Sequence, residues 1–182
     1  MSSALLRLAA LCVLALVAGC STLNEKECLS DSWYNIGLRD GANGRPEHYI
    51  AEHAAACQKY AVAPDHERWL EGRQRGLESY CTVRNGLRVG EAGGSYEGVC
   101  VAPNEQEFLR GYELGLEINR LGSRLNAVRG EIRSVESTLA DKKKDLTEKE
   151  RDQLVLRLRE YEYQRGALET DYDRLQWRAR GL

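Results

Sequence analysis

The sequence predicts an all-α protein: a small disulfide-stapled helical head followed by a long antiparallel coiled-coil helical hairpin. Residues 21–104 contain every proline, every histidine and four of the six cysteines of the 182-residue chain. Residues 105–182 contain none of these residue types and are rich in leucine, glutamate, arginine and lysine, which favour long helices. We therefore divide the chain into a leader (1–19), an N-terminal tether (20–30), the head (31–104) and the hairpin (105–182).

The start of the chain is typical of an export signal. Arg7 precedes an apolar run, "LAALCVLALVAG", with the length and flanks of a secretory signal peptide. At about 1.5 Å per residue this run is too short to cross a hydrocarbon core of about 30 Å. A transmembrane anchor is therefore not expected.

The apolar run ends in "VAGC", which resembles the bacterial lipobox, where signal peptidase cuts before a lipidated cysteine. The resemblance implies that the mature chain begins at Cys20 with acyl chains, and each buried methylene contributes about 0.8 kcal/mol to membrane binding. Ser21, in place of an aspartate, indicates the outer membrane by the enterobacterial sorting pattern. The alternative is a cleaved signal with Cys20 as a disulfide partner.

Once the leader is removed and the lipobox cysteine takes lipid, four cysteines remain: Cys28, Cys57, Cys81 and Cys100. An even number of cysteines in an oxidising compartment indicates disulfides, and three pairings are possible. We favour Cys28–Cys57 and Cys81–Cys100, because the second pair closes a short glycine-rich loop. A zinc site is the alternative, since His53 lies four residues before Cys57. No C-x-x-C pair is present among them, however, and we predict no metal.

The head is expected to contain three short helices. They cover residues 32–40, 46–60 and 64–80, and proline opens the second and third, where the first turn does not need its missing N–H. The segment 82–100 carries five glycines. We expect it to be a loop or a short hairpin, because glycine resists helix formation.

An aromatic residue, a glycine three places later and a second glycine four places beyond recur in three segments. They are "YNIGLRDG" from Tyr34, "WLEGRQRG" from Trp69 and "FLRGYELG" from Phe108. Glycines four apart share one helix face and cost about 1 kcal/mol each relative to alanine, so close helix contact would explain them. The alternative is that Gly41 and Gly76 simply end helices.

Four segments of the head carry a family resemblance: "CLSDSWYNIGLRDG", "YIAEHAAAC", "GRQRGLESYC" and "GSYEGVC". Together they resemble a family of uncharacterised Gram-negative bacterial lipoproteins with a conserved domain of unknown function. The similarity covers roughly residues 23–120. It implies lipidation, an envelope location and paired cysteines, and it implies no particular reaction.

The second half of the chain predicts a coiled-coil seam, because apolar residues alternate at spacings of four and three. The seam residues are Leu114, Ile118, Leu121, Leu125, Val128, Ile132, Val135 and Leu139. A matching face follows at Leu154, Leu158, Tyr161, Leu168, Tyr172 and Leu175. It is interrupted at Arg165, whose aliphatic stem can still cover the seam.

Two capping boxes are predicted at the starts of these helices: Asn104 with Glu107, and Thr147 with Glu150. The seam fails between them, inside "DKKKDL", so a second helix is expected to begin there. A short connection favours antiparallel neighbours and hence a hairpin. One long helix that dimerises is the alternative.

No catalytic residue is predicted. The histidines His48, His53 and His66 lack the spacing of a zinc protease, and no phosphate loop or nucleophile elbow occurs, so no enzyme and no cofactor is expected. A candidate ligand groove for a glycan or peptide could be lined by aromatic rings. Its residues would be Trp33, Tyr34, Trp69 and Tyr96, and the alternative is that these rings fill a core.

Charge excludes nucleic acid as a partner, because residues 21–104 carry nine basic and twelve acidic side chains and residues 105–182 carry sixteen of each. We expect a lipid-anchored protein on the periplasmic face of the bacterial outer membrane, with a structural or adaptor role. Its partners would be the membrane, through the lipid, and an envelope protein or a second copy, through the coiled coil. A ligand-binding lipoprotein is the runner-up, and an enzyme that uses the head histidines is less favoured.

Overall fold

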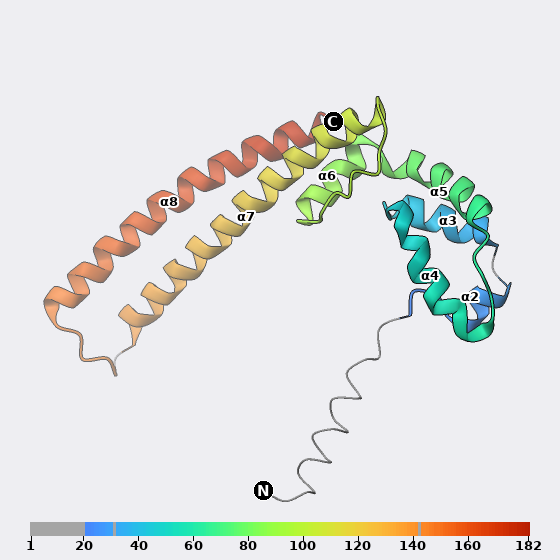
Figure 1. Cartoon of the computed structure of the whole chain (residues 1–182). Coiled ribbons are helices and arrows are strands. Elements are labelled where there is room, and N and C mark those ends of the chain that lie inside the picture. The colour runs from blue at the N-terminus through green and yellow to red at the C-terminus, as the bar shows by residue number, and fades with distance from the viewer. Residues whose placement is uncertain (1–20, 31, 142) are drawn as a thin grey trace, which may run out of the picture. The chain divides into compact units, whose positions relative to one another are not determined.

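A computed structural model describes residues 21–30, 32–141 and 143–182 (Figure 1). The predicted leader and Cys20 lie outside the described residues. The described part contains helices and no β-strand, which confirms the all-α class. The helices are α2 (Glu25–Ser30), α3 (Trp33–Ala42), α4 (Ile50–Cys57), α5 (His66–Tyr80), α6 (Val83–Glu91), α7 (Asn104–Ala140) and α8 (Glu148–Arg180), with 3-10 turns η1 (Glu47–Tyr49) and η2 (Gln58–Tyr60).

The chain forms two compact units. Among the described residues, unit 1 holds those from Ser21 to Gly41 together with Arg45–Gly76, and unit 2 holds Ala42–Gly44 together with those from Leu77 to Leu182. The boundary lies within α5, whereas the sequence predicted one boundary between head and hairpin at residue 104. The last part of the predicted head therefore belongs to the same unit as the hairpin.

Unit 1 is built around a small core that contains one disulfide. Cys28 and Cys57 are bonded, with their Cα atoms 5.6 Å apart, which is the first of the two favoured pairings. Leu23 is 1% exposed in this core. Segment 20–30 was expected to be a tether, but its described residues pack on the unit. The reciprocal hydrogen bonds between Asn24 and Glu27 cap α2 there.

Segment 82–100 differs from the prediction of a loop, because residues Val83–Glu91 form α6. The side chain of Thr82 accepts the backbone N–H of Asn85 and caps the helix. Two of the five glycines that argued against a helix, Gly86 and Gly90, are buried against α7. Close packing of two backbones offsets their low helix propensity, and this gain cannot be read from the segment alone.

Close helix contact explains the first glycine of each recurrent segment. In unit 1, a Cβ added to Gly37 would overlap the carbonyl oxygen of Trp69, and one on Gly72 would overlap that of Tyr34. The alternative of helix termination does not hold for Gly41, which lies within α3, or for Gly76, which lies within α5.

The α6/α7 pair of unit 2 repeats these contacts. A Cβ added to Gly86 would overlap the carbonyl oxygen of Phe108, and one on Gly111 would overlap that of Val83. One turn later, Gly90 meets Tyr112 and Gly115. The contacts advance along both helices together, so α6 and α7 run parallel. Cys81 and Cys100, the second favoured pairing, are bonded in the same unit.

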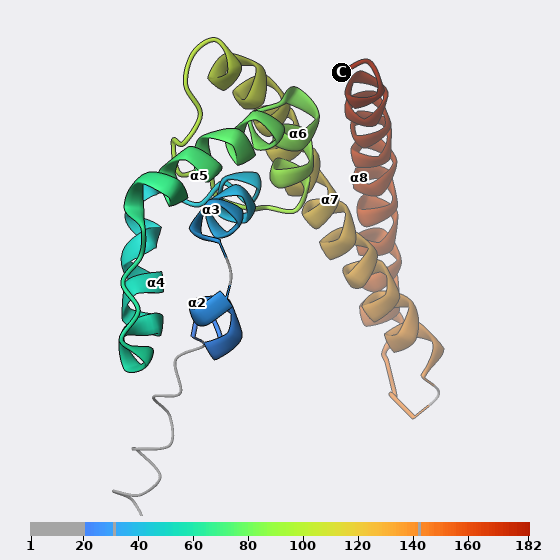
Figure 2. The same ribbon diagram turned by 90° about the vertical axis from the view of Figure 1, so that its right-hand side faces the viewer.

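The predicted hairpin is present in unit 2, where α7 and α8 run side by side in opposite directions (Figures 1 and 2). The Arg129 guanidinium lies 2.9 Å from the Glu169 carboxylate across the pair. All the predicted seam residues of both helices are buried or half-buried. Arg165, the predicted interruption, is also half-buried.

The two predicted capping boxes have different outcomes. Thr147 and Glu150 form a complete capping box at the start of α8, and the hydrogen bonds from Thr147 lower the pKa of Glu150. The box of Asn104 with Glu107 is wrong: Asn104 is already helical, Pro103 precedes it without a side-chain cap, and Glu107 pairs with Arg110 at 2.7 Å. Helical position, as well as residue type, decides whether a cap can form.

Candidate functional site

A buried polar network occupies the centre of unit 1. The Oδ2 atom of Asp40 lies 2.7 Å from Nε2 of His53 and accepts a hydrogen bond of 2.8 Å from Nε1 of Trp69. The Nδ1 atom of His53 lies 2.8 Å from the Oγ1 atom of Thr22. The network, defined as Thr22, Asp40, His53 and Trp69, thus joins the N-terminal segment to α3, α4 and α5.

The geometry of this network favours a structural role over chemistry. Both ring nitrogens of His53 are engaged, and its side chain is 2% exposed, so neither nitrogen is open to a substrate. Cys57, the other half of the weighed zinc pair, is held in a disulfide. A general base needs access to the proton that it removes, and His53 lacks that access in this conformation.

The other two histidines do not assemble a site. His48 and His66 are exposed, whereas His53 is 1% exposed. Among the described residues, no three or more histidine, cysteine, aspartate or glutamate side chains gather as a metal site would require. Of the three histidines, only His53 is buried with defined polar partners. These partners lie at irregular distances from His53 in the sequence.

The four candidate groove residues lie in two different units. In unit 1, Trp69 is completely buried, and Trp33 is partly buried against the same core. Tyr34 lies 5.7 Å below the Arg68 guanidinium. Tyr96, in unit 2, packs against Phe108 in a tilted arrangement with 4.7 Å between ring centroids. Trp69 and Tyr96 therefore fill cores, which was the alternative to a groove.

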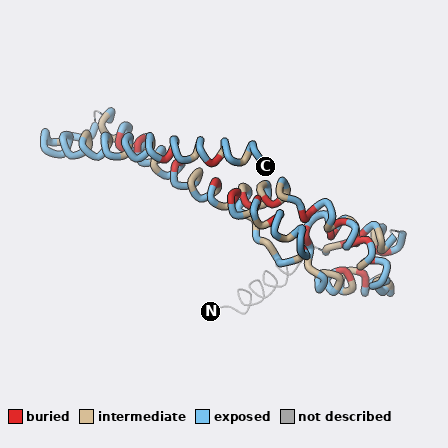
Figure 3. The backbone as a smooth tube through the Cα atoms, turned by 90° about the horizontal axis from the view of Figure 1, so that it is seen from above, coloured by how far each residue is buried: buried red, intermediate tan, exposed pale blue. Residues whose placement is uncertain are grey.

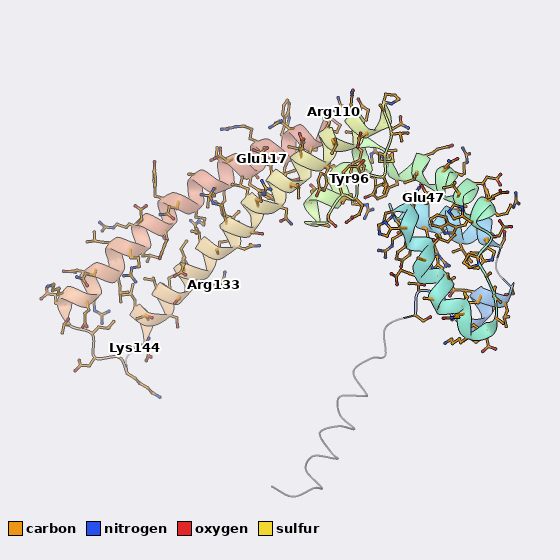
Figure 4. All side chains as sticks on the ribbon, in the orientation of Figure 1. Glu47, Tyr96, Arg110, Glu117, Arg133 and Lys144 are labelled. Atoms are coloured by element: carbon orange, nitrogen blue, oxygen red, sulfur yellow. A yellow bond between two sulfur atoms is a disulfide. The ribbon has the colours of Figure 1, made fainter. Side chains whose placement is uncertain are left out.

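Tyr96 also ties the second disulfide to the start of α7 in unit 2 (Figure 4). Its hydroxyl donates to the Glu105 carboxylate at 3.0 Å and accepts the backbone N–H of Cys100 at 3.0 Å. Burial raises the pKa of Tyr96, and burial likewise raises the pKa of Tyr80, which stacks on Phe108. These groups stay neutral in the folded state over a wider pH range than when unfolded.

The hairpin presents the largest exposed surface of unit 2. Figure 3 shows pale-blue exposed backbone along most of its length. The loop at its tip carries the exposed Lys143 and Lys144 (Figure 4). On α8, three large apolar side chains face solvent: Leu156 (62% exposed), Tyr163 (77%) and Trp177 (75%). Side chains of this kind on a helix surface are candidates for contact with another macromolecule.

Sequence reasoning missed a fourth copy of the glycine pattern. "VRNGLRVG", in α6, has both glycines at the spacing of the other three segments, with Val83 in the aromatic position. The spacing of its two glycines was the only feature of the sequence that indicated this fourth copy. Each copy supplies one helix of a close-packed pair, so the four copies form two pairs, each within a unit that holds one disulfide.

Comparison with known proteins gives a domain and no activity. Residues 32–117 match the model of a family described as "Protein of unknown function (DUF2799)". No curated protein and no solved structure matches the chain. The matched range contains all four glycine segments and stops within α7. The matched range therefore covers the helices of the two close-packed pairs as far as residue 117, and most of the hairpin lies beyond it.

Proposed function

We propose that this protein is a lipid-anchored component of the bacterial outer membrane, on the periplasmic face, that acts as a structural adaptor through α7 and α8 and catalyses no reaction. The apolar leader that ends at Cys20 supports the anchor. The two disulfides support an oxidising compartment. No helix among the described residues is long and apolar enough to cross a membrane.

The hairpin is the observation that carries the adaptor role. α7 has 37 residues, which at about 1.5 Å each gives a length of about 55 Å. The first part of α7 packs on α6 and also on α8, since Leu114 and Ile118 share a cluster with Leu175 of α8. Two helices cannot shield every apolar side chain between them, so a long mixed surface remains available to a partner.

A shallow recess of about 490 Å³ lies between the two helices and adds shape to this surface. Its apolar wall comes from Leu121 and Val128 of α7 and from Tyr163 and Leu168 of α8. Arg124 and Asp171 lie at the same recess. A combination of apolar contacts with charged neighbours is typical of protein interfaces that form and dissociate.

Photocrosslinking in intact cells tests the adaptor role. A photoreactive amino acid at position 163 of α8 should give adducts with one or a few defined envelope components or with a second copy. The same group at His48 or His66, which are exposed in unit 1, is the matched control and should give fewer defined adducts. Adducts from the control positions and none from the hairpin would overturn the proposal.

The anchor is tested separately by mass spectrometry of the mature protein purified from membranes. The expected N-terminal residue is Cys20 with acyl chains on sulfur and amine. A chain that begins elsewhere, or that begins at Cys20 with an unmodified thiol, would contradict lipidation and leave the crosslinking result independent of it.

A further inference from the structure

The helix α8 carries two faces with heptad spacing. Its inner face contributes the seam with α7. A second series with alternating intervals of three and four residues lies on the opposite side of the helix by its spacing, and two of its members, Tyr163 and Asp173, also border recesses that α7 lines. We define this outer stripe as Leu156, Arg159, Tyr163, Gly166, Thr170, Asp173 and Trp177. An unbroken series with these intervals is the pattern with which one helix meets another.

The apolar members of the outer stripe are unusually exposed. Leu156, Tyr163 and Trp177 are 62%, 77% and 75% exposed, and they are separated by seven and fourteen residues. Seven residues are two turns of a coiled-coil helix, so all three side chains lie along one line. An occupant that covers all three side chains must be elongated and must lie along α8, as a second helix could in either chain direction.

Gly166 lies at the middle of the outer stripe without a contact to explain it. A Cβ added to Gly166 would meet no atom within 4 Å beyond its own helix backbone, whereas Gly37, Gly72 and Gly111 each face the backbone of another helix. A glycine inside a helix costs about 1 kcal/mol relative to alanine. Tyr163 precedes it by three residues, as an aromatic residue does in the close-packed pairs.

The charges of the outer stripe are complementary to those of a second, antiparallel α8. Arg159 and Asp173 lie seven residues before and after Gly166, and both are exposed. Neither forms an ion pair with the described residues. A second α8 that runs antiparallel and crosses at Gly166 places Arg159 opposite the partner's Asp173. The same arrangement places Leu156, ten residues before Gly166, within one residue of the level of the partner's Trp177, eleven residues after it.

We infer that two copies of this chain associate through the outer stripes of α8, antiparallel and with Gly166 at the crossing. The contact is isologous, so each opposite-charge pair and each Leu156–Trp177 pair forms twice. A parallel arrangement, such as α6 and α7 adopt, would place Arg159 against Arg159 and Asp173 against Asp173. Like charges directly opposed are destabilising, which favours the antiparallel register.

The inferred dimer goes beyond the proposed function, because it does not require a lipid or an envelope partner. The stripe spans 21 intervals of about 1.5 Å, or about 32 Å, so the interface falls at the small end of the range for specific complexes. We therefore expect reversible, concentration-dependent association. Confinement of both copies to one membrane surface would raise their effective concentration and strengthen the contact.

Analytical ultracentrifugation of the full mature chain with Cys20→Ser, both disulfides intact, tests the association without lipid. We expect the sedimentation coefficient to rise from monomer to dimer with concentration. Tyr163→Glu should remove this rise, whereas Leu29→Glu, at a similarly exposed leucine of α2, should leave it unchanged. Circular dichroism checks that the variants retain their helix content. A chain that stays monomeric at every concentration would overturn the inference.

Charge exchange tests the register. Arg159→Asp or Asp173→Arg alone should weaken the dimer roughly tenfold, because each change converts two opposite-charge pairs into two like-charge pairs. The double variant should restore it. In a parallel dimer the single variants would only replace one set of like-charge pairs by another, so unchanged affinity would contradict the antiparallel arrangement.

Engineered cysteines provide an independent readout of the same register. A mixture of Leu156→Cys and Trp177→Cys chains should form a mixed disulfide under mild oxidation, and neither variant alone should form a disulfide with itself. Disulfides within each single variant would indicate the parallel register and overturn the proposed one. A monomer whose position 163 crosslinks to a different protein would overturn self-association and leave the adaptor role standing.

Discussion

Two helix pairs of unit 2 share α7, yet they are held together by different interactions. α6 and α7 meet backbone to backbone at Gly86 and Gly111, within the unit that Cys81–Cys100 closes. α7 and α8 meet through side chains, many of them only half-buried, with an ion pair between Arg129 and Glu169 at their margin. The first pair leaves no room for change, whereas the second can adjust its side chains. This difference separates a rigid domain from a surface that can adapt to a partner.

Removal of the disulfides is the change with the largest expected effect on this contrast. Cys81→Ser with Cys100→Ser should lower the free energy of unfolding by about 3 kcal/mol, because a loop of 19 residues no longer restricts the unfolded chain. Cys28→Ser with Cys57→Ser should cost slightly more, since 29 residues separate that pair. Urea unfolding followed by circular dichroism measures both. Equal stability with and without the bonds would refute the rigid-domain interpretation.

Substitution of glycine in the two pairs compares them directly. Gly111→Ala should destabilise unit 2 by about 2 to 3 kcal/mol, because its Cβ would overlap the carbonyl oxygen of Val83. Gly130→Ala, in the hairpin part of α7, is the matched control: its Cβ would meet only the end of Arg133, 3.9 Å away. That control should gain up to about 1 kcal/mol. Similar losses at the two positions would contradict the contrast between the pairs.

Unit 1 extends the contrast to polar contacts. Asp40→Ala should cost about 2 to 3 kcal/mol, because it leaves His53 and Trp69 buried without their common acceptor. Thr22→Val keeps the shape of the side chain and removes one partly buried hydrogen bond, so about 1 kcal/mol is expected. Thermal unfolding of both variants beside the parent chain compares them. A larger loss of stability for Thr22→Val would mean that the network depends more on its contact with the N-terminal segment than on Asp40.

The smallest expected effect is a dependence of stability on alkaline pH. Burial raises the pKa of Tyr80 from its ordinary value of 10.0, so the unfolded chain loses this proton at a lower pH than the folded chain does. Stability is therefore fully present below about pH 10 and falls as pH rises through the higher folded-state pKa. Urea midpoints across this window measure the effect. Tyr80→Phe should show a shallower fall, because the titrating group is gone.

Much of this architecture was predictable because it is encoded in local or strictly periodic patterns. The seam of α7 has a regular alternation, and the cap of α8 depends only on Thr147 and Glu150. The helix α6 was missed because its glycines are helix breakers unless another backbone lies against them, and that backbone belongs to residues 108–116. This contact depends on tertiary structure, so a prediction from the local sequence treats glycine only as a helix breaker.

The candidate site was harder to predict from the sequence than the fold was, because it too depends on tertiary contacts. Asp40, His53 and Trp69 are 13 to 29 residues apart and follow no motif. Their convergence depends on the close packing of α3 and α5 at Gly37 and Gly72. His53 could be selected by residue type alone, but its partners could not. For the aromatic residues, residue type alone suggested a ligand groove. Their burial in the structure instead places Trp69 and Tyr96 in cores.

The burial of Leu23 has a consequence for how the molecule would move. Two residues, Ser21 and Thr22, lie between Cys20 and Leu23, and the three fully extended steps reach at most about 11 Å. Under the proposed lipidation, unit 1 would have almost no slack above the bilayer, and its tumbling would be slowed to that of the lipids around it. Time-resolved fluorescence anisotropy of the lipidated protein in vesicles should then show little fast rotation.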